Sequence, residues 1–262
     1  MYEGFRIVAV TPAGRRRYLE LLTSHTSAAR GLLDEHQLWL NTNDRGDIAF
    51  VRSLAARDSF FRAVDCPQHV AQLPPNSARI HAFFPECCDS ATIYIRFDDD
   101  IVYIAPDAIQ ELLDCRLEHL RPPIVYANTV NNAICSHLHQ RFGLIDYTRG
   151  TAHYDCCCQI GWRSGPFAEL AHRSFLRALA SESRHRFKMP NWDLWAYERV
   201  SINCIAWFGR DFAPFGGHIG FDDEVWLAEE HPRIEQRPNL ICGSALVGHF
   251  AFYTQRDYLD AT

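Results

Sequence analysis

The chain has 262 residues, of which 47% are hydrophobic and 22% are charged, an ordinary composition for a soluble globular protein. Its formal net charge of −6 disfavours a broad nucleic-acid-binding surface, and with it a nucleic-acid acceptor. No apolar stretch approaches the roughly 20 residues of a membrane-spanning helix, and residues 1–6 lack the pattern of a signal peptide. We therefore expect a single domain over residues 1–262, without a transmembrane segment and located in the cytoplasm.

Strands and helices alternate in the first hundred residues. Apolar runs predict strands at residues 7–10, 37–40, 78–84 and 93–97, and helical periodicity predicts helices at 16–26, 28–35 and 47–54. This alternation is typical of a parallel sheet covered by helices, in which ligands bind beyond the carboxyl ends of the strands. Polar clusters follow three of these strands, at residues 11–15, 41–44 and 98–100, so we expect them to line one cleft.

The second half of the chain continues with mixed elements. A helix is predicted at residues 106–120, a strand at 124–128, and further helices at 167–184 and 199–208. Residues 136–164 show no clear period and predict irregular structure or a substrate-facing insertion.

Three adjacent acids end the strand at residues 93–97. Asp98, Asp99 and Asp100 are followed at once by a second apolar run, residues 101–104. Carboxylates next to a core require a counter-charge, and a divalent cation with oxygen ligands satisfies that need. Because side chains alternate along an extended segment, Asp98 and Asp100 point one way and Asp99 the other. That spacing allows Asp98 and Asp100 to reach one metal ion.

Ten cysteines are present, but their spacing does not define a metal site. Residues 156–158 are three consecutive cysteines rather than a C-x2-C pair. We interpret them as buried free thiols, with a zinc site formed by His153, Cys156 and Cys158 as the alternative.

The acid triplet behind an apolar strand, with the strand and helix order around it, resembles metal-dependent glycosyltransferases of the GT-A fold that carry a D-x-D motif. The resemblance implies a Rossmann-type nucleotide-binding sheet covered by helices, with residues 1–105 binding a nucleotide sugar and residues 106–262 binding an acceptor. It also implies Mn²⁺ or Mg²⁺ held by Asp98, Asp100 and His249, the histidine being in the segment Gly248-His249-Phe250 near the C-terminus. The implied reaction moves a sugar from a nucleoside diphosphate, with uridine as the expected base, to the hydroxyl of a glycan, a lipid-linked sugar or another acceptor.

The remaining expected site residues fall into two groups. The base, ribose and phosphates are expected to contact Thr11, Pro12, Ala13, Arg15, Asn41, Asp47, Asp99, Gln255 and Arg256. Glu198, at the predicted start of an apolar helix, is expected to face the acceptor as a general base, with Asp193 and Asp223 as rivals. Trp192, Trp195 and Trp207 are aromatic candidates for sugar stacking.

Two other classes of protein share these features. A metal-dependent sugar nucleotidyltransferase or phosphohydrolase would use the same acids to hold its metal, and the arginine-rich loop after the first strand is compatible with it. A non-catalytic carbohydrate-binding protein on the same scaffold is the third reading.

Overall fold

The computed structural model describes residues 1–74, 78–220 and 222–261. Within them, nine strands form one sheet in the order β3-β2-β1-β4-β8-β6-β9-β5, with β7 added beside β9. The strands are β1 (Arg6–Ala13), β2 (Glu35–Leu40), β3 (Phe61–Val64), β4 (Thr92–Phe97), β5 (Ile101–Ile104), β6 (Val125–Val130), β7 (Trp192–Asp193), β8 (Cys204–Phe208) and β9 (Leu240–His249).

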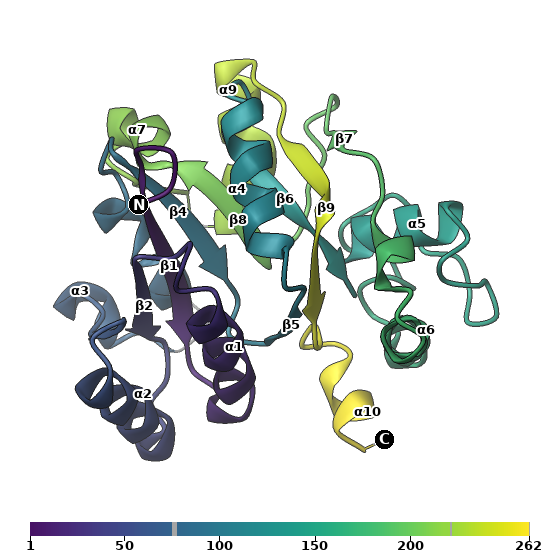
Figure 1. Ribbon diagram of the computed structural model, residues 1–262, viewed down its shortest axis with the longest axis horizontal. Helices are drawn as coiled ribbons and strands as arrows, with labels where there is room; N and C mark the ends of the chain where they lie inside the picture. Colours follow the sequence, from purple (N-terminus) through teal and green to yellow (C-terminus); the bar gives the residue numbers. More distant parts are fainter. Residues whose placement is uncertain (75–77, 221, 262) are drawn as a thin grey trace.

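The sheet is mixed rather than parallel. Strands β3, β2, β1 and β4 run parallel, β8 is antiparallel to both of its neighbours, and β6 and β9 are parallel to each other. The carboxyl ends of β1, β2, β4, β6 and β9 therefore lie at one edge, where β8 and β5 begin. In Figure 1 the arrowheads of β1, β2 and β9 point toward this edge, at the bottom of the view.

Helices and short turns cover both faces of the sheet, so the central strands β1, β4, β6 and β8 bury side chains on two sides. The longer helices are α1 (Arg16–Ala28), α2 (Arg45–Arg57), α4 (Ala108–Glu118), α5 (Ala133–Arg141) and α6 (Gly165–Ala180). The shorter ones are α3 (Gln68–Ala71), η1 (Ala78–His81), η2 (Phe84–Glu86), η3 (Arg184–Phe187), α7 (Gly209–Phe212), η4 (Ala213–Phe215), α8 (Asp223–Val225), η5 (Trp226–Glu230), α9 (His231–Glu235) and α10 (Arg256–Ala261).

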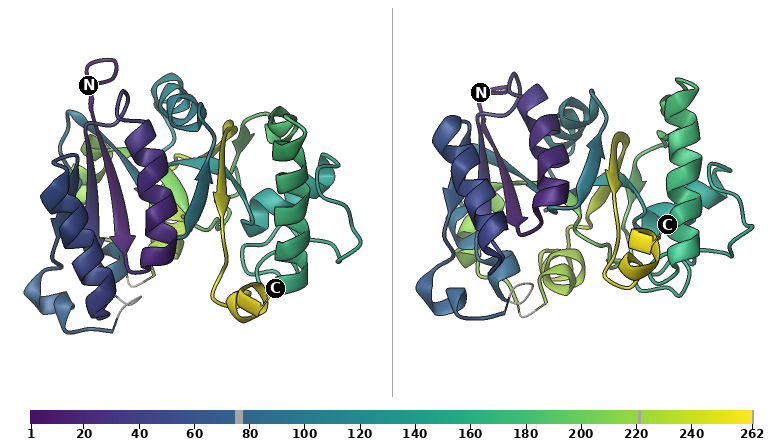
Figure 2. Two further views of the ribbon diagram at one scale, coloured as in Figure 1. Left: turned by 60° about the horizontal axis from the view of Figure 1, so that its bottom comes forward. Right: turned by 90° about the horizontal axis from the view of Figure 1, so that it is seen from below.

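Alternate residues of β1 enter two separate hydrophobic cores. Ile7 and Ala9 pack with the apolar faces of α1 and α4, whereas Val8 and Val10 pack with the aromatic cluster around Trp207. Each core forms on one face of the sheet because successive side chains of a strand point to opposite faces. Figure 2 shows α6 standing beside β9, with the C-terminal α10 against its lower end.

Polar residues at the ends of strands start several of the helices. Asp44 accepts a hydrogen bond from the amide of Asp47 at the start of α2, and Asn132 accepts from the amides of Ile134 and Cys135 at the start of α5. Such caps satisfy amides that have no partner within the helix. The strand-to-helix connections thus have fixed geometry at the edge where the carboxyl ends of the strands meet.

Three predicted elements are wrong. Residues 199–208 form an irregular segment followed by β8 rather than a helix, because β8 is buried on both faces and its unbroken apolar run hides the period of two. Residues 78–84 form 3₁₀ turns rather than a strand, and α1 ends at Ala28, so no second helix covers residues 28–35. Residues 136–141, expected to be irregular, belong to α5.

Candidate active site

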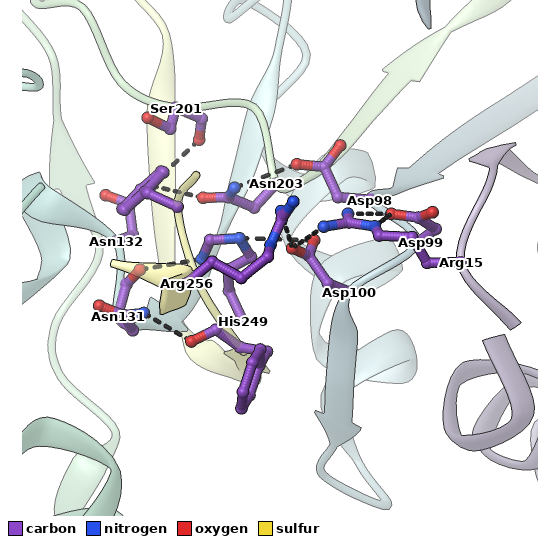
Figure 3. A network of polar contacts seen from close by, with 12 residues as sticks. Arg15, Asp98, Asp99, Asp100, Asn131, Asn132, Ser201, Asn203, His249 and Arg256 are labelled. Atoms are coloured by element: carbon purple, nitrogen blue, oxygen red, sulfur yellow. Dashed lines mark hydrogen bonds and ion pairs between the residues drawn. The ribbon is translucent and has the colours of Figure 1, made fainter. Parts of the chain in front are cut away.

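The three acids lie in the tight turn between β4 and β5. Strand β4 ends at Phe97, and β5 starts at Ile101 and pairs antiparallel with β9, so that Ile101 lies opposite His249. This register brings Asp100 Oδ1 within 3.4 Å of His249 Nε2 (Figure 3). The amide of Phe250 also donates to the carbonyl oxygen of Asp100 at 2.9 Å, which fixes the backbone beside the pair.

Arg15, from the loop after β1, neutralises two of the acids. Its Nε donates to Asp99 Oδ1 at 2.9 Å, and its Nη1 lies 3.0 Å from Asp100 Oδ2. The amide of Gly14 donates to Asp99 Oδ2 at 2.9 Å, and a Cβ on Gly14 would come within 2.9 Å of the carbonyl oxygen of Asn41. Glycine is therefore required for the loop to approach the acids and the end of β2 at the same time.

Burial and charge act differently on the three carboxyl groups. Burial raises the pKa of Asp98, and it raises the pKa of Asp99 to about 6 despite the opposing effect of Arg15, so Asp99 is still ionised at neutral pH. For Asp100 burial is overcome by His249, Arg15 and Arg256, which lower its pKa to about 2. Asp100 is therefore the most strongly ionised of the three.

Arg96 connects the acid turn with a second acidic segment. It comes from β4, only 2% of its side chain is exposed, and it pairs with Asp98 and Asp223 at 2.9 Å each. A buried guanidinium requires such partners because its desolvation is costly when it stands alone. Arg96 thus ties Asp223, at the start of α8, to the acids after β4.

His249 is oriented by the backbone. Its Nδ1 lies 3.1 Å from the carbonyl oxygen of Asn131, which only accepts, so Nδ1 carries a proton. In the neutral ring this leaves the lone pair of Nε2 facing Asp100. Burial lowers the pKa of His249, but the carboxylate of Asp100 outweighs it and the net shift is upward.

Asparagines that follow β6 and precede β8 hold Asp98. Asn132 donates to the side-chain oxygen of Asn203 at 3.0 Å, and Asn203 donates to Asp98 Oδ2 at 3.1 Å (Figure 3). Asn132 also donates to the carbonyl oxygen of Ser201. The sequence did not predict this row of hydrogen bonds from Asn132 through Asn203 to Asp98, because residue 203 lies in a segment predicted to be helical. Its only indication was the presence of polar residues after a strand.

The donor set at this turn fits a divalent cation in part. Among the described residues, no group of three His, Cys, Asp or Glu side chains forms a ready metal site. Asp100 and His249 nevertheless place a carboxylate oxygen and an imidazole nitrogen 3.4 Å apart, and these are ligand types that Mn²⁺ and Mg²⁺ accept once Nε2 has given up its proton. The contact of Nδ1 with a carbonyl is the arrangement that orients metal-bound histidines. These two residues fit a cation that takes its other ligands from a bound phosphate and water.

A cavity of about 480 Å³ opens over the acid turn. Four arginines and six carboxylates line it, which gives a net charge of −2 with His249 neutral: Arg15, Arg96, Arg199, Arg256, Asp98, Asp99, Asp100, Asp222, Asp223 and Glu224. Pro12, Asn41 and Ile80, from the N-terminal part of the chain, also line it. So do three aromatic residues from later in the chain, Trp162, Phe252 and Tyr253. The three polar clusters after β1, β2 and β4 therefore meet in one cavity.

Several other residues expected at the site lie elsewhere. Thr11 and Ala13 are buried within β1, and Thr11 bonds to His36 instead. The side chain of Asp47 accepts from the amide of Arg16 and from Thr42, and Gln255 is buried in bonds to Asn131 and Gly161. These four stabilise the loops around the cavity and do not line it.

The expected acceptor-facing residues are also displaced, except for Asp223. Glu198 does not start a helix; its carboxylate accepts from Tyr154 and from the amide of Ala196, outside the cavity. Asp193 is exposed in β7 and pairs with Leu240, at the opposite end of β9 from His249. Trp207 is fully buried, and Trp192 and Trp195 do not line the cavity, whereas Trp162 does although its period-free segment gave no signal.

The cysteines do not form a metal site within the described part of the chain. All ten are free, and most are buried. Cys156 contacts Ser201 and Glu224 at 3.2 Å each, Cys157 lines the cavity, and Cys158 accepts from the amide of Gly161. The three consecutive thiols thus serve separate contacts.

No protein-family model and no curated protein matches the sequence. Among solved structures, the chain is similar to 4-diphosphocytidyl-2C-methyl-D-erythritol synthase from Anaerococcus prevotii, with a TM-score of 0.50 and 10% identity over 99% of this chain and 97% of that one. It also matches CMP:2-keto-3-deoxy-manno-octonic acid synthetase, with a TM-score of 0.48 and 12% identity over 99% and 96% of the two chains. Glucosyl-3-phosphoglycerate synthase from Mycobacterium tuberculosis gives a TM-score of 0.40 and 17% identity over 79% and 56%.

These likenesses concern the fold alone. The chain is a single α/β domain with a mixed, Rossmann-type sheet covered by helices, which confirms the predicted fold class. No described helix combines the length and apolar character needed to cross a membrane.

Proposed function

We propose that the protein is a metal-dependent glycosyltransferase that uses a nucleoside-diphosphate sugar, with UDP-sugars as the first choice of donor. The observation that carries the proposal is the cavity over the acid turn, where Asp100 and His249 face each other beside Arg15 and Arg256. With a net charge of −2 from its lining side chains, this cavity repels a diphosphate unless a cation accompanies it. A nucleotide that arrives with Mn²⁺ or Mg²⁺ matches it.

The diphosphate would contact Arg256, whereas Arg15, which is engaged by Asp99 and Asp100, would hold the acids in place beside it. Arg256 Nη2 is 3.8 Å from Asp100, and its Nε is buried without a hydrogen-bonding partner among the described residues. Such an unpaired donor is costly and is satisfied by a phosphate oxygen. Asp100 and His249 would hold the metal ion, which would stabilise the charge that develops on the leaving diphosphate, and Asp98 would lie beside it, held by Arg96 and Asn203. Pro12 and Asn41 line the side of the cavity where the base and ribose would lie.

Asp223 is the carboxylate we assign to the acceptor hydroxyl. It lines the cavity, and Arg96 ties its Oδ2 to Asp98, while its Oδ1 has no hydrogen-bonding partner among the described residues. An ionised carboxylate in this position accepts the proton of a hydroxyl as that hydroxyl attacks the sugar. Asp223 replaces Glu198 in this role because Glu198 does not line the cavity.

A sugar nucleotidyltransferase is the second candidate, and the architecture it shares with 4-diphosphocytidyl-2C-methyl-D-erythritol synthase keeps it in consideration. Such an enzyme needs backbone amides and a basic side chain free to cradle a triphosphate. Here the amide of Gly14 and the guanidinium of Arg15 are both engaged by Asp99. That engagement favours transfer from a diphosphate sugar.

The test is a thermal-shift panel of nucleotide sugars and nucleoside triphosphates with and without Mn²⁺, followed by product analysis. A donor at 100 times its Kd should stabilise the protein by about 2.7 kcal/mol. Metal-dependent stabilisation by a UDP-sugar and release of UDP with a suitable acceptor is the expected result. Stabilisation by a nucleoside triphosphate and release of pyrophosphate would replace the proposal with nucleotidyl transfer, and binding without any turnover would leave a carbohydrate-binding protein.

A further inference from the structure

The outer part of the cavity carries an aromatic platform. Tyr253 lines the cavity with 71% of its surface exposed, and Trp162 packs against it with ring centroids 5.3 Å apart and planes at 86°. Other rings of this chain are also exposed, such as Trp195 at 66%, but Tyr253 differs from Trp195 in that it lines the cavity. Trp162 supports the ring of Tyr253 from a segment nearly a hundred residues earlier in the chain.

This platform is held in place by hydrogen bonds. The hydroxyl of Thr254 donates to the carbonyl oxygen of Trp162 at 2.6 Å, and Gln255 donates to that of Gly161 at 3.3 Å. Phe252 continues the row of rings inward and lies 4.8 Å from the ring of His249, centroid to centroid. The aromatic row therefore leads from the acid turn to the mouth of the cavity, with Tyr253 at its outer end.

Carboxylates supply the polar groups of the outer cavity. Arg199 holds Glu224 through Nε at 2.6 Å and Asp222 through Nη2 at 3.1 Å. The charge of Arg199 is thus already compensated, and two carboxylates share one guanidinium. Their remaining lone pairs accept hydrogen bonds from hydroxyl groups.

No arginine lining the cavity is left without a carboxylate partner, within the part of the chain that the structure describes. Arg15, Arg96, Arg199 and Arg256 each pair with at least one acid. An anionic acceptor would therefore meet surplus negative charge in the outer cavity, whereas a neutral polyhydroxylated molecule would meet acceptors for its hydroxyls and a ring face for its C–H groups.

We propose that the outer cavity is an acceptor site for neutral carbohydrate, in which a sugar ring stacks on Tyr253 and its hydroxyls donate to Asp222 and Glu224. The proposal deepens the proposed sugar transfer. Its claim that the bound sugar is the acceptor rests on that transfer. The binding surface itself depends only on the outer residues, so it is measurable without a donor.

The experiment measures binding of neutral trisaccharides (maltotriose, cellotriose, chitotriose, galactotriose) and of trigalacturonate by ligand-observed NMR and calorimetry. The wild-type protein should bind at least one neutral trisaccharide, and galactotriose at least as tightly as its acidic counterpart. Tyr253→Ala should lower the affinity for the neutral ligand roughly tenfold, the usual effect of losing an aromatic contact. Tyr253→Phe should retain the wild-type affinity. Trp195→Ala is the matched control, because Trp195 is 66% exposed but lies outside the cavity.

Asp222→Asn with Glu224→Gln tests the charge argument. The double variant should reduce the preference for the neutral ligand over trigalacturonate. Tighter binding of trigalacturonate by the wild type, wild-type binding by Tyr253→Ala, or no binding of any neutral trisaccharide at millimolar concentration would each overturn the proposal.

Binding of UDP with Mn²⁺, measured on the same variants, separates the two proposals. If the neutral sugar binds on Tyr253 but UDP with Mn²⁺ does not bind, the carbohydrate site stands and sugar transfer falls. If UDP with Mn²⁺ binds and no neutral sugar does, the carbohydrate site falls and the donor site stands.

Discussion

The carboxylates on two sides of the cavity differ in burial and pairing. We call the side with Asp99 and Asp100 the inner wall, and the side with Asp222 and Tyr253 the outer wall. On the inner wall Asp99 and Asp100 are almost fully buried, and each is paired with a basic side chain from a different part of the chain. On the outer wall Asp222 has 44% of its side chain exposed, and Tyr253 is largely in solvent.

The difference follows from solvation. A buried carboxylate has no water to replace a lost partner, so its position is fixed by Arg15, Arg96 and His249 and its removal leaves other charges uncompensated. An exposed carboxylate is hydrated in the free protein and can exchange water for a ligand at little cost. We expect substitutions on the inner wall to abolish binding or chemistry, and substitutions on the outer wall to change selectivity.

The largest effect is expected for Asp100→Ala. This change removes the partner that Arg15, Arg256 and His249 share, together with the oxygen ligand that we propose for the metal ion. Metal-dependent binding of UDP should fall roughly 100-fold or more, because even indirect ligand contacts are worth 10- to 100-fold. Calorimetry with and without Mn²⁺ measures the loss, and circular dichroism checks the fold.

Asp193→Ala is the matched control for that experiment. Asp193 is exposed in β7, beside the end of β9 that is far from His249. The variant protein should therefore bind UDP as the wild type does. Asp100→Asn keeps the shape of the side chain and should also lose the metal dependence. Unchanged metal-dependent affinity in both Asp100 variants would remove this residue from the metal site.

The second effect concerns Asp223, which stands between the two walls. Asp223→Asn keeps the shape and a hydrogen-bonding group but removes the basic oxygen, so sugar transfer should fall roughly 100-fold. Because Arg96 retains Asp98 as a partner, the affinity for the donor should change less than the rate. Glu198→Gln should keep most of the activity, since Glu198 bonds to Tyr154 outside the cavity.

The measurement is the transfer rate at saturating donor and acceptor, with KM values determined separately. A large loss in Glu198→Gln and none in Asp223→Asn would return the role to Glu198. Comparable small losses in both would indicate a mechanism that needs no carboxylate base.

The inner wall could be predicted from the sequence because local patterns define it. The acids stand directly after a strand, and Arg15 and Asn41 follow the ends of β1 and β2, whose carboxyl ends necessarily meet at one edge. His249 came from the family resemblance, and the register of β5 with β9 supplies its physical basis, which is a long-range pairing that no local pattern reveals.

The outer wall could not be predicted in the same way. Trp162 and Arg199 lie in segments without regular secondary structure, and the buried strand β8 imitates a helix in its apolar composition. Asn203 and Asp98 meet only because β8 pairs antiparallel with β4, which the alternation of strands and helices does not predict. Irregular segments are positioned by tertiary contacts, so their residues carry little local signal.

The smallest effect expected tests how dry the region behind the inner wall is. His36 is fully buried, between the hydroxyls of Thr11 in β1 and Thr26 in α1, and burial lowers its pKa to about 3. In the unfolded chain a histidine takes up its proton near pH 6.5. The unfolded state therefore binds one more proton than the folded state between these values, so His36 makes stability fall as the pH falls from 6.5 toward 3. At pH 5 the loss should be about 2 kcal/mol relative to neutral pH.

Asp99, whose pKa is raised to about 6, acts in the opposite sense, so variants must be compared rather than absolute values. His36→Gln should unfold more easily at pH 7 but lose less stability between pH 7 and pH 5 in urea titrations, whereas the exposed His185→Gln should keep the wild-type slope. Identical slopes in all three proteins would mean that His36 is protonated in the folded state and that water reaches the strand behind the acids.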